Sequence, residues 1–251
     1  MSLPQNSETI QNIKDKLKLL QGNTNWQSVL YPWLRTELTY TSNSLEGNTL
    51  SLIETGMIVN DNMSVAGKNF REIYEAQNHA KAFDFIQNNL LAKKSQDLNE
   101  NDLLDIHKLI LKNIDETNYG KYRTVSVRIA GSNSIFPNSL KVPDLMSEIF
   151  GWIKNCKLEN VEDILETTIL IHLKIVKIHP FTDGNGRTAR LFMNTILMQN
   201  NLPPIDILPE NRAEYLESLE SSTAQSPNQF MDFCLKQYLQ NLSTYLTTFE
   251  N

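Results

Sequence analysis

Residues 179–190 read HPFTDGNGRTAR and separate two apolar segments of the chain. The preceding segment, VEDILETTILIHLKIVKI (161–178), is apolar almost all round at helical spacing, which predicts a buried central helix. The following segment, LFMNTILMQNN (191–201), predicts another apolar helix, which Pro203 and Pro204 would stop. We therefore expect a polar loop between two helices of the core.

The glycines and arginines of this loop suit an anion. Gly184 and Gly186 flank Asn185, so the backbone can turn sharply and direct its N–H groups toward one point. A helix that starts near Gly186 would aim its positive end at the same point. Arg187 and Arg190 share one face of its first turn, where the helix dipole repels cations. A bound di- or triphosphate would explain both arginines.

Three further side chains add to this chemistry. Asp183 alone would repel phosphate, but Mg²⁺ favours one or two carboxylates together with phosphate oxygens. His179 can act as a general base near neutral pH. Phe181 is expected to anchor the loop in the core. Singly, each residue also fits a plain turn or a helix cap, and the combination favours the phosphate site.

The rest of the chain is mainly helical in pattern. Segments 71–92, 99–114 and 142–155 show helical spacing, and two further stripes do so near the N-terminus, Ile10, Ile13, Leu17 and Leu20, then Leu30, Leu34, Leu38, Thr41 and Leu45. Strand-like alternation occurs at Val125, Val127 and Ile129, before the turn-prone GSNS, which predicts one β-hairpin at 124–136. We expect one all-α domain that carries a single small hairpin.

Composition narrows the functional class. The net charge is −6 and no block of Lys or Arg stands out, so a nucleic-acid partner is not expected. No apolar run reaches the roughly 18 residues that span a bilayer, so no membrane partner is expected. The N-terminus lacks a signal-peptide pattern, and Cys156 and Cys234 read as reduced thiols. The expected location is the cytoplasm.

The loop resembles the signature of the Fic domain family, HxFx(D/E)GNGRxxR. Every fixed position of that signature is matched, by His179, Phe181, Asp183, Gly184, Asn185, Gly186, Arg187 and Arg190. The resemblance implies a Fic-type helical bundle with the hairpin as its flap. The expected division is an N-terminal helical extension at 1–29 and a Fic domain at 30–251.

Fic proteins most often transfer AMP from ATP to a protein hydroxyl, so the resemblance implies ATP as donor, Mg²⁺ as cofactor and a target Ser, Thr or Tyr. His179 would be the base and Asp183 the magnesium ligand. The phosphates would be held by Gly184, Asn185, Gly186, Arg187 and Arg190, with Arg190 reaching the γ-phosphate. The flap, with Val127, Arg128, Ile129, Ala130 and Gly131, would dock the target by strand addition.

A second stretch, TSNSLEGN (41–48), places Glu46 in the last turn of an expected helix, where the dipole disfavours a carboxylate. Ser42 lies one turn earlier, within reach of Glu46. Ser42, Glu46 and Gly47 match the inhibitory motif (S/T)xxxE(G/N) of the Fic family. The resemblance implies an inhibitory helix at about 38–47 whose Glu46 restrains Arg190, and thus an autoinhibited enzyme.

Several alternatives stay open at this point. Related Doc-type kinases carry alanine in place of Gly184, so the glycine favours AMP transfer over phosphate transfer. The same site could remove AMP from a modified protein with help from Glu46, or could use another nucleotide donor. A nucleotide-binding module without turnover is a third option, which the intact His179 disfavours. Relatives of this class often dimerise, so a homodimer is also open.

Overall fold

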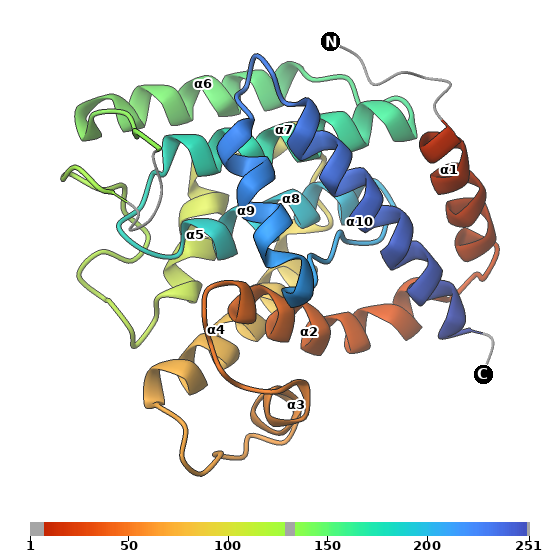
Figure 1. Cartoon of the computed structure of the whole chain (residues 1–251), viewed down its shortest axis with the longest axis horizontal. Coiled ribbons are helices and arrows are strands. Elements are labelled where there is room, and N and C mark those ends of the chain that lie inside the picture. The colour runs from red at the N-terminus through yellow and green to blue at the C-terminus, as the bar shows by residue number, and fades with distance from the viewer. Residues whose placement is uncertain (1–7, 129–133, 250–251) are drawn as a thin grey trace.

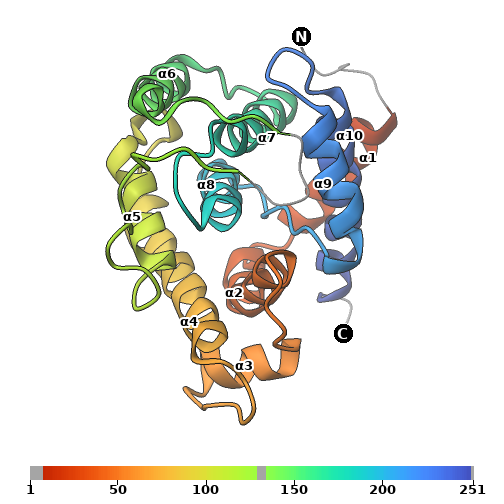
Figure 2. The ribbon, with the colours of Figure 1, turned by 60° about the vertical axis from the view of Figure 1, so that its left-hand side comes forward.

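Helix α8 (Asn185–Gln199) lies at the centre of the molecule, and other helices surround it on all sides (Figures 1 and 2). Almost all of its side chains are buried, although the helix carries two arginines. Its neighbour α7 (Val161–Ile178) packs directly against it, and the loop between them has only six residues. The sequence pattern predicted both helices, and α7 has the expected bounds.

The computed structural model describes residues 8–128 and 134–249. Besides α7 and α8, the α-helices in these ranges are α1 (Glu8–Gln21), α2 (Trp26–Leu45), α3 (Leu52–Asn60), α4 (Phe70–Phe85), α5 (Glu100–Ile110), α6 (Val142–Asn155), α9 (Arg212–Ser221) and α10 (Asn228–Thr247). No strand forms within the described residues, so this part of the chain is all-α as expected.

The two ends of the described chain pack together. Helix α1 lies against α10, and the stripe predicted for it, Ile10, Ile13, Leu17 and Leu20, is buried there. Lys14 also forms an ion pair with Glu162 at the start of α7. These contacts join the segment expected to be an extension to the common hydrophobic core.

Helix α3 was not expected from the sequence. It begins with a capping box formed by Ser51 and Glu54, and it packs on α2 and α4. A small core of its own lies beneath it, made of Leu50, Ile58, Val59, Ala76 and Ala80. Figure 2 shows that α3 stands at the far end of the molecule from α6 and α7. Ile53 of α3 and Phe70 nearby are exposed.

The segment expected as a hairpin shows no strand in its described residues, which include Val127 and Arg128. Ile129, Ala130 and Gly131 lie outside the described residues. Buried Arg123 holds the two ends of the segment, because its guanidinium donates to the carbonyl of Val125 at 2.8 Å and to that of Pro137 at 2.7 Å. The hairpin itself remains a prediction.

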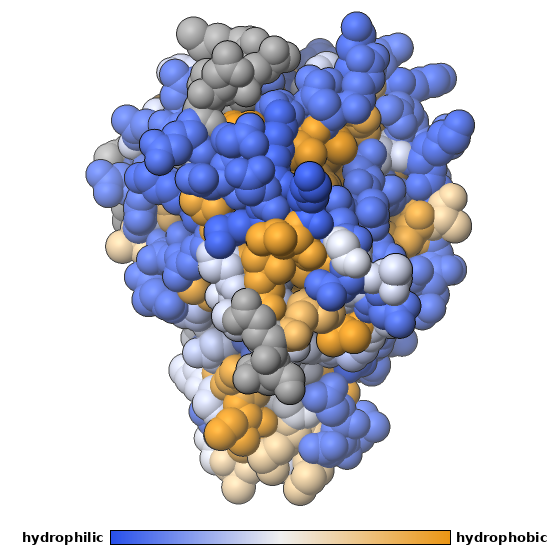
Figure 3. Space-filling view, turned by 90° about the vertical axis from the view of Figure 1, so that its right-hand side faces the viewer, coloured by the Kyte–Doolittle hydropathy of each residue, from blue (hydrophilic) through white to orange (hydrophobic). Residues whose placement is uncertain are grey.

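The surface is largely polar. Figure 3 shows the face that carries α1, where hydrophilic side chains cover most of the area and apolar side chains form separate patches. Scattered apolar residues of this kind are normal on folded proteins. Among the described residues, no helix combines the length and the apolar character that crossing a bilayer requires.

We expect the free energy of unfolding to fall as the pH drops from about 6.5 toward 4. Burial lowers the pKa of His79 and His172 to about 3, and of His107 and His179 to about 4. Between the ordinary pKa of histidine and these lowered values, the unfolded chain binds protons that the folded chain does not bind. For each histidine, this difference lowers the free energy of unfolding by about 1.4 kcal/mol per pH unit as the pH falls. Burial raises the pKa of Asp206 to about 7, so the folded chain binds one proton there that the unfolded chain does not bind. This proton offsets the effect of one histidine. Urea unfolding at pH 7.5 and pH 5 measures the difference, and equal free energies would contradict this account.

Candidate active site

The chain reverses direction between α7 and α8 through two left-handed residues. His179 ends α7 with φ +52°, and Gly184 precedes α8 with φ +77°. The side chain of Asn185 closes the loop, because its amide donates to the carbonyl of Phe181 and its oxygen accepts from the N–H of Phe181, both at 2.9 Å. Phe181 is fully buried, as the sequence predicted. The loop is therefore fixed from within.

His107 of α5 packs against the loop and holds its backbone, a role that no local sequence pattern predicts. Its ring stacks on Phe181 with 3.6 Å between ring centres. Its Nδ1 accepts from the N–H of Gly120 at 2.9 Å, which leaves Nε2 to donate to the carbonyl of Asp183 at 3.0 Å. Burial lowers the pKa of His107 to about 4, so this neutral tautomer persists at pH 7. A side chain at Gly184 would lie 3.4 Å from this ring.

His179, the expected general base, lies at the end of α7 and lines a cavity. Its ring stacks on Phe136 at 4.3 Å between centres, and its carbonyl accepts from Nε of Arg123 at 2.7 Å. Burial lowers the pKa of His179 to about 4, so the imidazole is neutral and able to accept a proton at pH 7. Arg123 thus connects His179 with the segment expected to be the flap.

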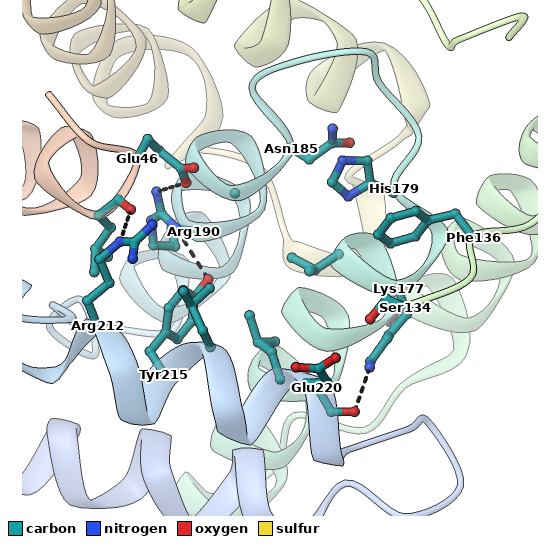
Figure 4. Close-up of a pocket in the computed structure, with 15 residues that line it drawn as sticks. Glu46, Ser134, Phe136, Lys177, His179, Asn185, Arg190, Arg212, Tyr215 and Glu220 are labelled. Atoms are coloured by element: carbon teal, nitrogen blue, oxygen red, sulfur yellow. Dashed lines mark hydrogen bonds and ion pairs between the residues drawn. The ribbon is translucent and has the colours of Figure 1, made fainter. Parts of the chain in front are cut away.

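Arg190 is buried in the second turn of α8 and contacts Ser42, Glu46 and Tyr215, of which Figure 4 shows the last two. Its Nε donates to Oγ of Ser42 and one Nη to the carbonyl of Ser42, both at 2.9 Å. The same Nη donates to a carboxylate oxygen of Glu46 at 2.7 Å, and the other Nη to the hydroxyl of Tyr215 at 3.2 Å. The Glu46–Arg190 pair has the expected partners. Ser42, expected to face Glu46, holds Arg190 instead.

Glu46 lies at the junction of two helix ends. It follows the last residue of α2, where the dipole disfavours it, but its carboxylate rests over the first turn of α8, where the dipole favours it. A Cβ atom at Gly186 would lie only 2.2 Å from the carboxylate oxygen of Glu46. The missing side chain of Gly186 therefore creates the seat for this carboxylate. Gly47, with φ +95°, lets the chain leave the helix there.

These groups surround a cavity of about 390 Å³ between α7, α8 and α9. Figure 4 shows His179 and Phe136 on one side and Glu46, Arg190 and Tyr215 on the other. Apolar side chains complete the wall: Leu45, Val176, Leu216 and Leu219. The volume and the mixed lining are typical of small-molecule sites. Tyr215 both packs in the core and lines this cavity.

Comparison with known protein families matches residues 97–197 to the Fic/DOC family. Those residues include α5, α7, the loop and most of α8. Residues 97–197 form a Fic/DOC family domain. The Fic signature in the loop predicted this result.

Curated relatives extend the similarity beyond the Fic/DOC domain. Protein adenylyltransferase fic-1 of Caenorhabditis elegans is 30% identical over 238 residues, which cover 95% of this chain and 46% of the relative. Protein adenylyltransferase Fic of Nematostella vectensis is 34% identical over 209 residues, or 83% of this chain and 48% of the relative. The chain thus spans about half the length of the curated relatives that it matches.

Solved structures share the fold. Residues 134–508 of C. elegans Fic-1 superpose with a TM-score of 0.83 at 28% identity, covering 96% of this chain and 71% of that one. A Fic domain protein from Bacteroides thetaiotaomicron superposes with a TM-score of 0.81 at 24% identity, covering 95% of both chains. The helical additions around the Fic/DOC domain therefore belong to a recurring architecture.

Asp183 and Arg187 of the Fic/DOC domain lie beside the cavity, and neither is among its lining residues. The Arg187 side chain is only 2% exposed, and it lies 3.3 Å from carboxylate oxygens of both Asp183 and Glu75. Burial would raise the pKa of Asp183, but Arg187, the N–H of Gly184 and Arg71 hold it below its usual value. The Asp183 carboxylate is therefore ionised at neutral pH.

The donor set around Asp183 fits Mg²⁺ in one specific way. No group of three or more His, Cys, Asp or Glu side chains within residues 8–128 and 134–249 could hold a metal without other ligands. A single ionised carboxylate beside the start of α8 could ligate magnesium only together with oxygens from another molecule, such as phosphate oxygens. Asp183 therefore fits magnesium as one of several ligands, and not as part of a protein-only metal site.

Sequence reasoning missed Arg71, Glu75, His107 and Arg123, which all contact the loop or its charged residues. One signal was available for Arg71. It occupies the first turn of α4, a position as unfavourable for a cation as those of the two arginines of α8. The other three depend on contacts between residues far apart in the sequence, and no local pattern marks them.

Proposed function

We propose that this chain is an autoinhibited protein adenylyltransferase that transfers AMP from ATP to a Ser, Thr or Tyr hydroxyl of a target protein, or of the chain itself. One observation carries the proposal. The cavity has the neutral base His179 on one side and Arg190 with the N-terminal turn of α8 on the other. Relatives named protein adenylyltransferase over most of this chain support the same activity.

The reaction follows from these positions. The target oxygen attacks the α-phosphorus of ATP, and the bond from that phosphorus to the bridging oxygen of the β-phosphate breaks. AMP becomes attached to the target, pyrophosphate leaves, and His179 accepts the hydroxyl proton. Arg190, Arg187 and the N–H groups of residues 184–186 bind the phosphates. Asp183 would hold Mg²⁺, which would neutralise charge on the phosphate oxygens when bound.

Glu46 restrains the reaction in this proposal. A carboxylate that occupies the seat over Gly186 and pairs with Arg190 takes the place where the γ-phosphate needs a positive partner. ATP then binds in an unproductive pose. The inhibitory segment is the C-terminal part of α2, which begins at Trp26, so α2 crosses the boundary proposed between 1–29 and 30–251.

The target and the location of the chain belong to the same proposal. A segment at 124–136 beside His179 suits a flap that aligns a target strand through residues 127–131. A homodimer is supported by the exposed apolar side chains of Ile53, Met63 and Phe70 on or beside α3. We place the protein in the cytoplasm, and we expect neither nucleic acid nor membrane as a partner.

We expect the Glu46→Gly variant to attach label from ATP to protein when the label is in the α-phosphate, and to attach none when it is in the γ-phosphate. AMP transfer retains the α-phosphorus, whereas phosphate transfer retains the γ-phosphorus. Purified protein with Mg²⁺ and each form of ATP, with and without cell lysate, gives the readout after denaturing electrophoresis. Label from the γ-position would contradict AMP transfer, and competition by UTP or CTP would identify another donor.

Removal of AMP from a modified protein is the second candidate. Its support is the Glu46 carboxylate, which is 39% exposed and lines the same cavity as His179. A carboxylate there can orient a water toward a bound phosphate ester. Protein labelled by the Glu46→Gly variant supplies the substrate. Release of AMP by the wild type, but not by that variant, would establish this reaction.

A further inference from the structure

The Asp183 carboxylate already has a cation on its outer side. One Nη of Arg71 lies 2.5 Å from Oδ2 of Asp183, although the two residues come from elements 112 positions apart. The other oxygen, Oδ1, accepts from the N–H of Gly184 at 2.6 Å and faces Arg187 at 3.3 Å. Both oxygens of the proposed magnesium ligand are thus engaged.

Arg71 belongs to a cluster whose charges cancel. Its Nε donates to a carboxylate oxygen of Glu75, one turn later on α4, at 3.1 Å. The same oxygen of Glu75 lies 3.3 Å from Arg187, and the other accepts from the amide of Asn48 at 3.0 Å. Two carboxylates and two guanidinium groups form a closed, neutral set. Adding a divalent ion at Asp183 would leave that set with an excess of two positive charges.

We propose that Arg71 is a resident counter-cation of Asp183, which lets the loop bind nucleotide phosphates without a metal and which competes with a divalent metal for that carboxylate. The inference rests on the proposed nucleotide site. An ion on Oδ2 of Asp183 would lie close to the Arg71 guanidinium, which is 2.5 Å from that atom, so the two positive charges would repel each other and compete for it. Arg71 is therefore a positioning residue that sets how strongly nucleotide binding depends on metal.

The Arg71 side chain can move away from Asp183 at little cost in free energy. Its side chain is 54% exposed, whereas that of Arg187 is only 2% exposed and stays in place. Rotation toward solvent breaks the contact with Asp183 and can keep the contact with Glu75 on the same helix face. A half-exposed ion pair is weak in water, so its rupture costs little.

Removal of the Arg71 charge should weaken nucleotide binding when no metal is present, and should leave it unchanged or strengthen it when a divalent metal is present. Without metal, Arg71→Gln leaves Asp183 with less positive charge nearby, so the carboxylate repels the phosphates more strongly. With metal, the same variant removes a competitor for Oδ2, so the metal–nucleotide complex binds at least as well. A residue that only contacted phosphate, or only supported the fold, would weaken binding in both conditions.

The test is calorimetric titration with α,β-methylene-ATP, an analogue that cannot donate AMP, in the Glu46→Gly background. Each protein is measured once in EDTA and once in saturating Mg²⁺. For Arg71→Gln we expect the Kd in EDTA to rise about threefold to fivefold, the range of a half-exposed ion pair, and the Kd in Mg²⁺ to stay equal or fall. Arg71→Lys keeps the charge and should preserve most of the original ratio.

Lys236→Gln is the matched control, because it removes one exposed, paired positive charge on α10 that does not line the cavity. Its ratio of the two Kd values should not change. Parallel weakening in both buffers for Arg71→Gln, or an unchanged ratio, would overturn the role of Arg71 while nucleotide binding stands. Absence of nucleotide binding by every protein in both buffers would overturn the proposed function and this inference together.

Discussion

Replacement of His179 by alanine is expected to lower the rate of AMP transfer by about 10²–10⁴-fold, the usual contribution of a general base. Nucleotide binding should persist, because the groups proposed to bind phosphate lie in and just before α8 and the imidazole lies across the cavity from Arg190. Label transfer from α-labelled ATP, measured in the Glu46→Gly background, gives the rate. Calorimetry with α,β-methylene-ATP gives the affinity.

The backbone at His179 calls for a second variant. Its φ of +52° lies in the left-handed region, which alanine adopts at a cost of roughly 1–2 kcal/mol. Asparagine tolerates that conformation better and cannot act as a base at neutral pH. His179→Asn should therefore lose transfer as completely as His179→Ala while it unfolds closer to the wild-type temperature. Normal transfer by the folded His179→Asn protein would refute the assignment of the base.

Glu46→Gly is expected to raise the rate of AMP transfer by at least about tenfold. The substitution removes a hydrogen bond between two charged groups, and such bonds contribute about 1.5–3 kcal/mol. It frees Arg190 for the γ-phosphate and clears the space over Gly186. Initial rates of α-label incorporation for the two proteins, at equal concentration and with the same lysate, measure the change. An unchanged rate would rule out restraint by Glu46.

Two further variants separate this effect from a general loosening of α2. Asp61 follows the last residue of α3 as Glu46 follows that of α2, and it does not line the cavity. Asp61→Gly should leave the rate unchanged. Ser42→Ala removes one hydrogen bond to Arg190 but keeps the carbonyl contact and Glu46. Its rate should therefore lie between those of the wild type and Glu46→Gly.

Much of the fold followed from local patterns in the sequence. The bounds of α7 could be read directly because Asn160 caps the helix and apolar residues continue to Ile178. Helix α3 escaped notice because it is short and lies between polar residues, although Ser51 and Glu54 form a capping box. Segment 71–92 was expected as one helix, but the α-helix changes to a π-helical turn at Ile86–Leu90, and apolar spacing does not mark that change.

The candidate site was partly readable for a different reason. The loop concentrates its chemistry in twelve consecutive positions, so His179, Asp183 and Arg190 could be found without knowing the fold. The Glu46–Arg190 contact joins residues 144 positions apart and was expected only through the resemblance to a known motif. The direction of the Ser42 side chain and the position of Arg71 depend on how α2 and α4 pack against the loop, which the sequence did not reveal.

The single missing methyl group at Gly186 has a consequence for how this chain can vary. In the proposed function, restraint and reaction both need that space, the first for a carboxylate of the protein and the second for a phosphate of the nucleotide. A larger residue at Gly186 would displace Glu46 and would also intrude on the proposed phosphate site, so we do not expect substitution there to give a fully active enzyme. Mutations that release activity should therefore arise on α2 and in the residues that hold its end, while the loop sequence stays fixed.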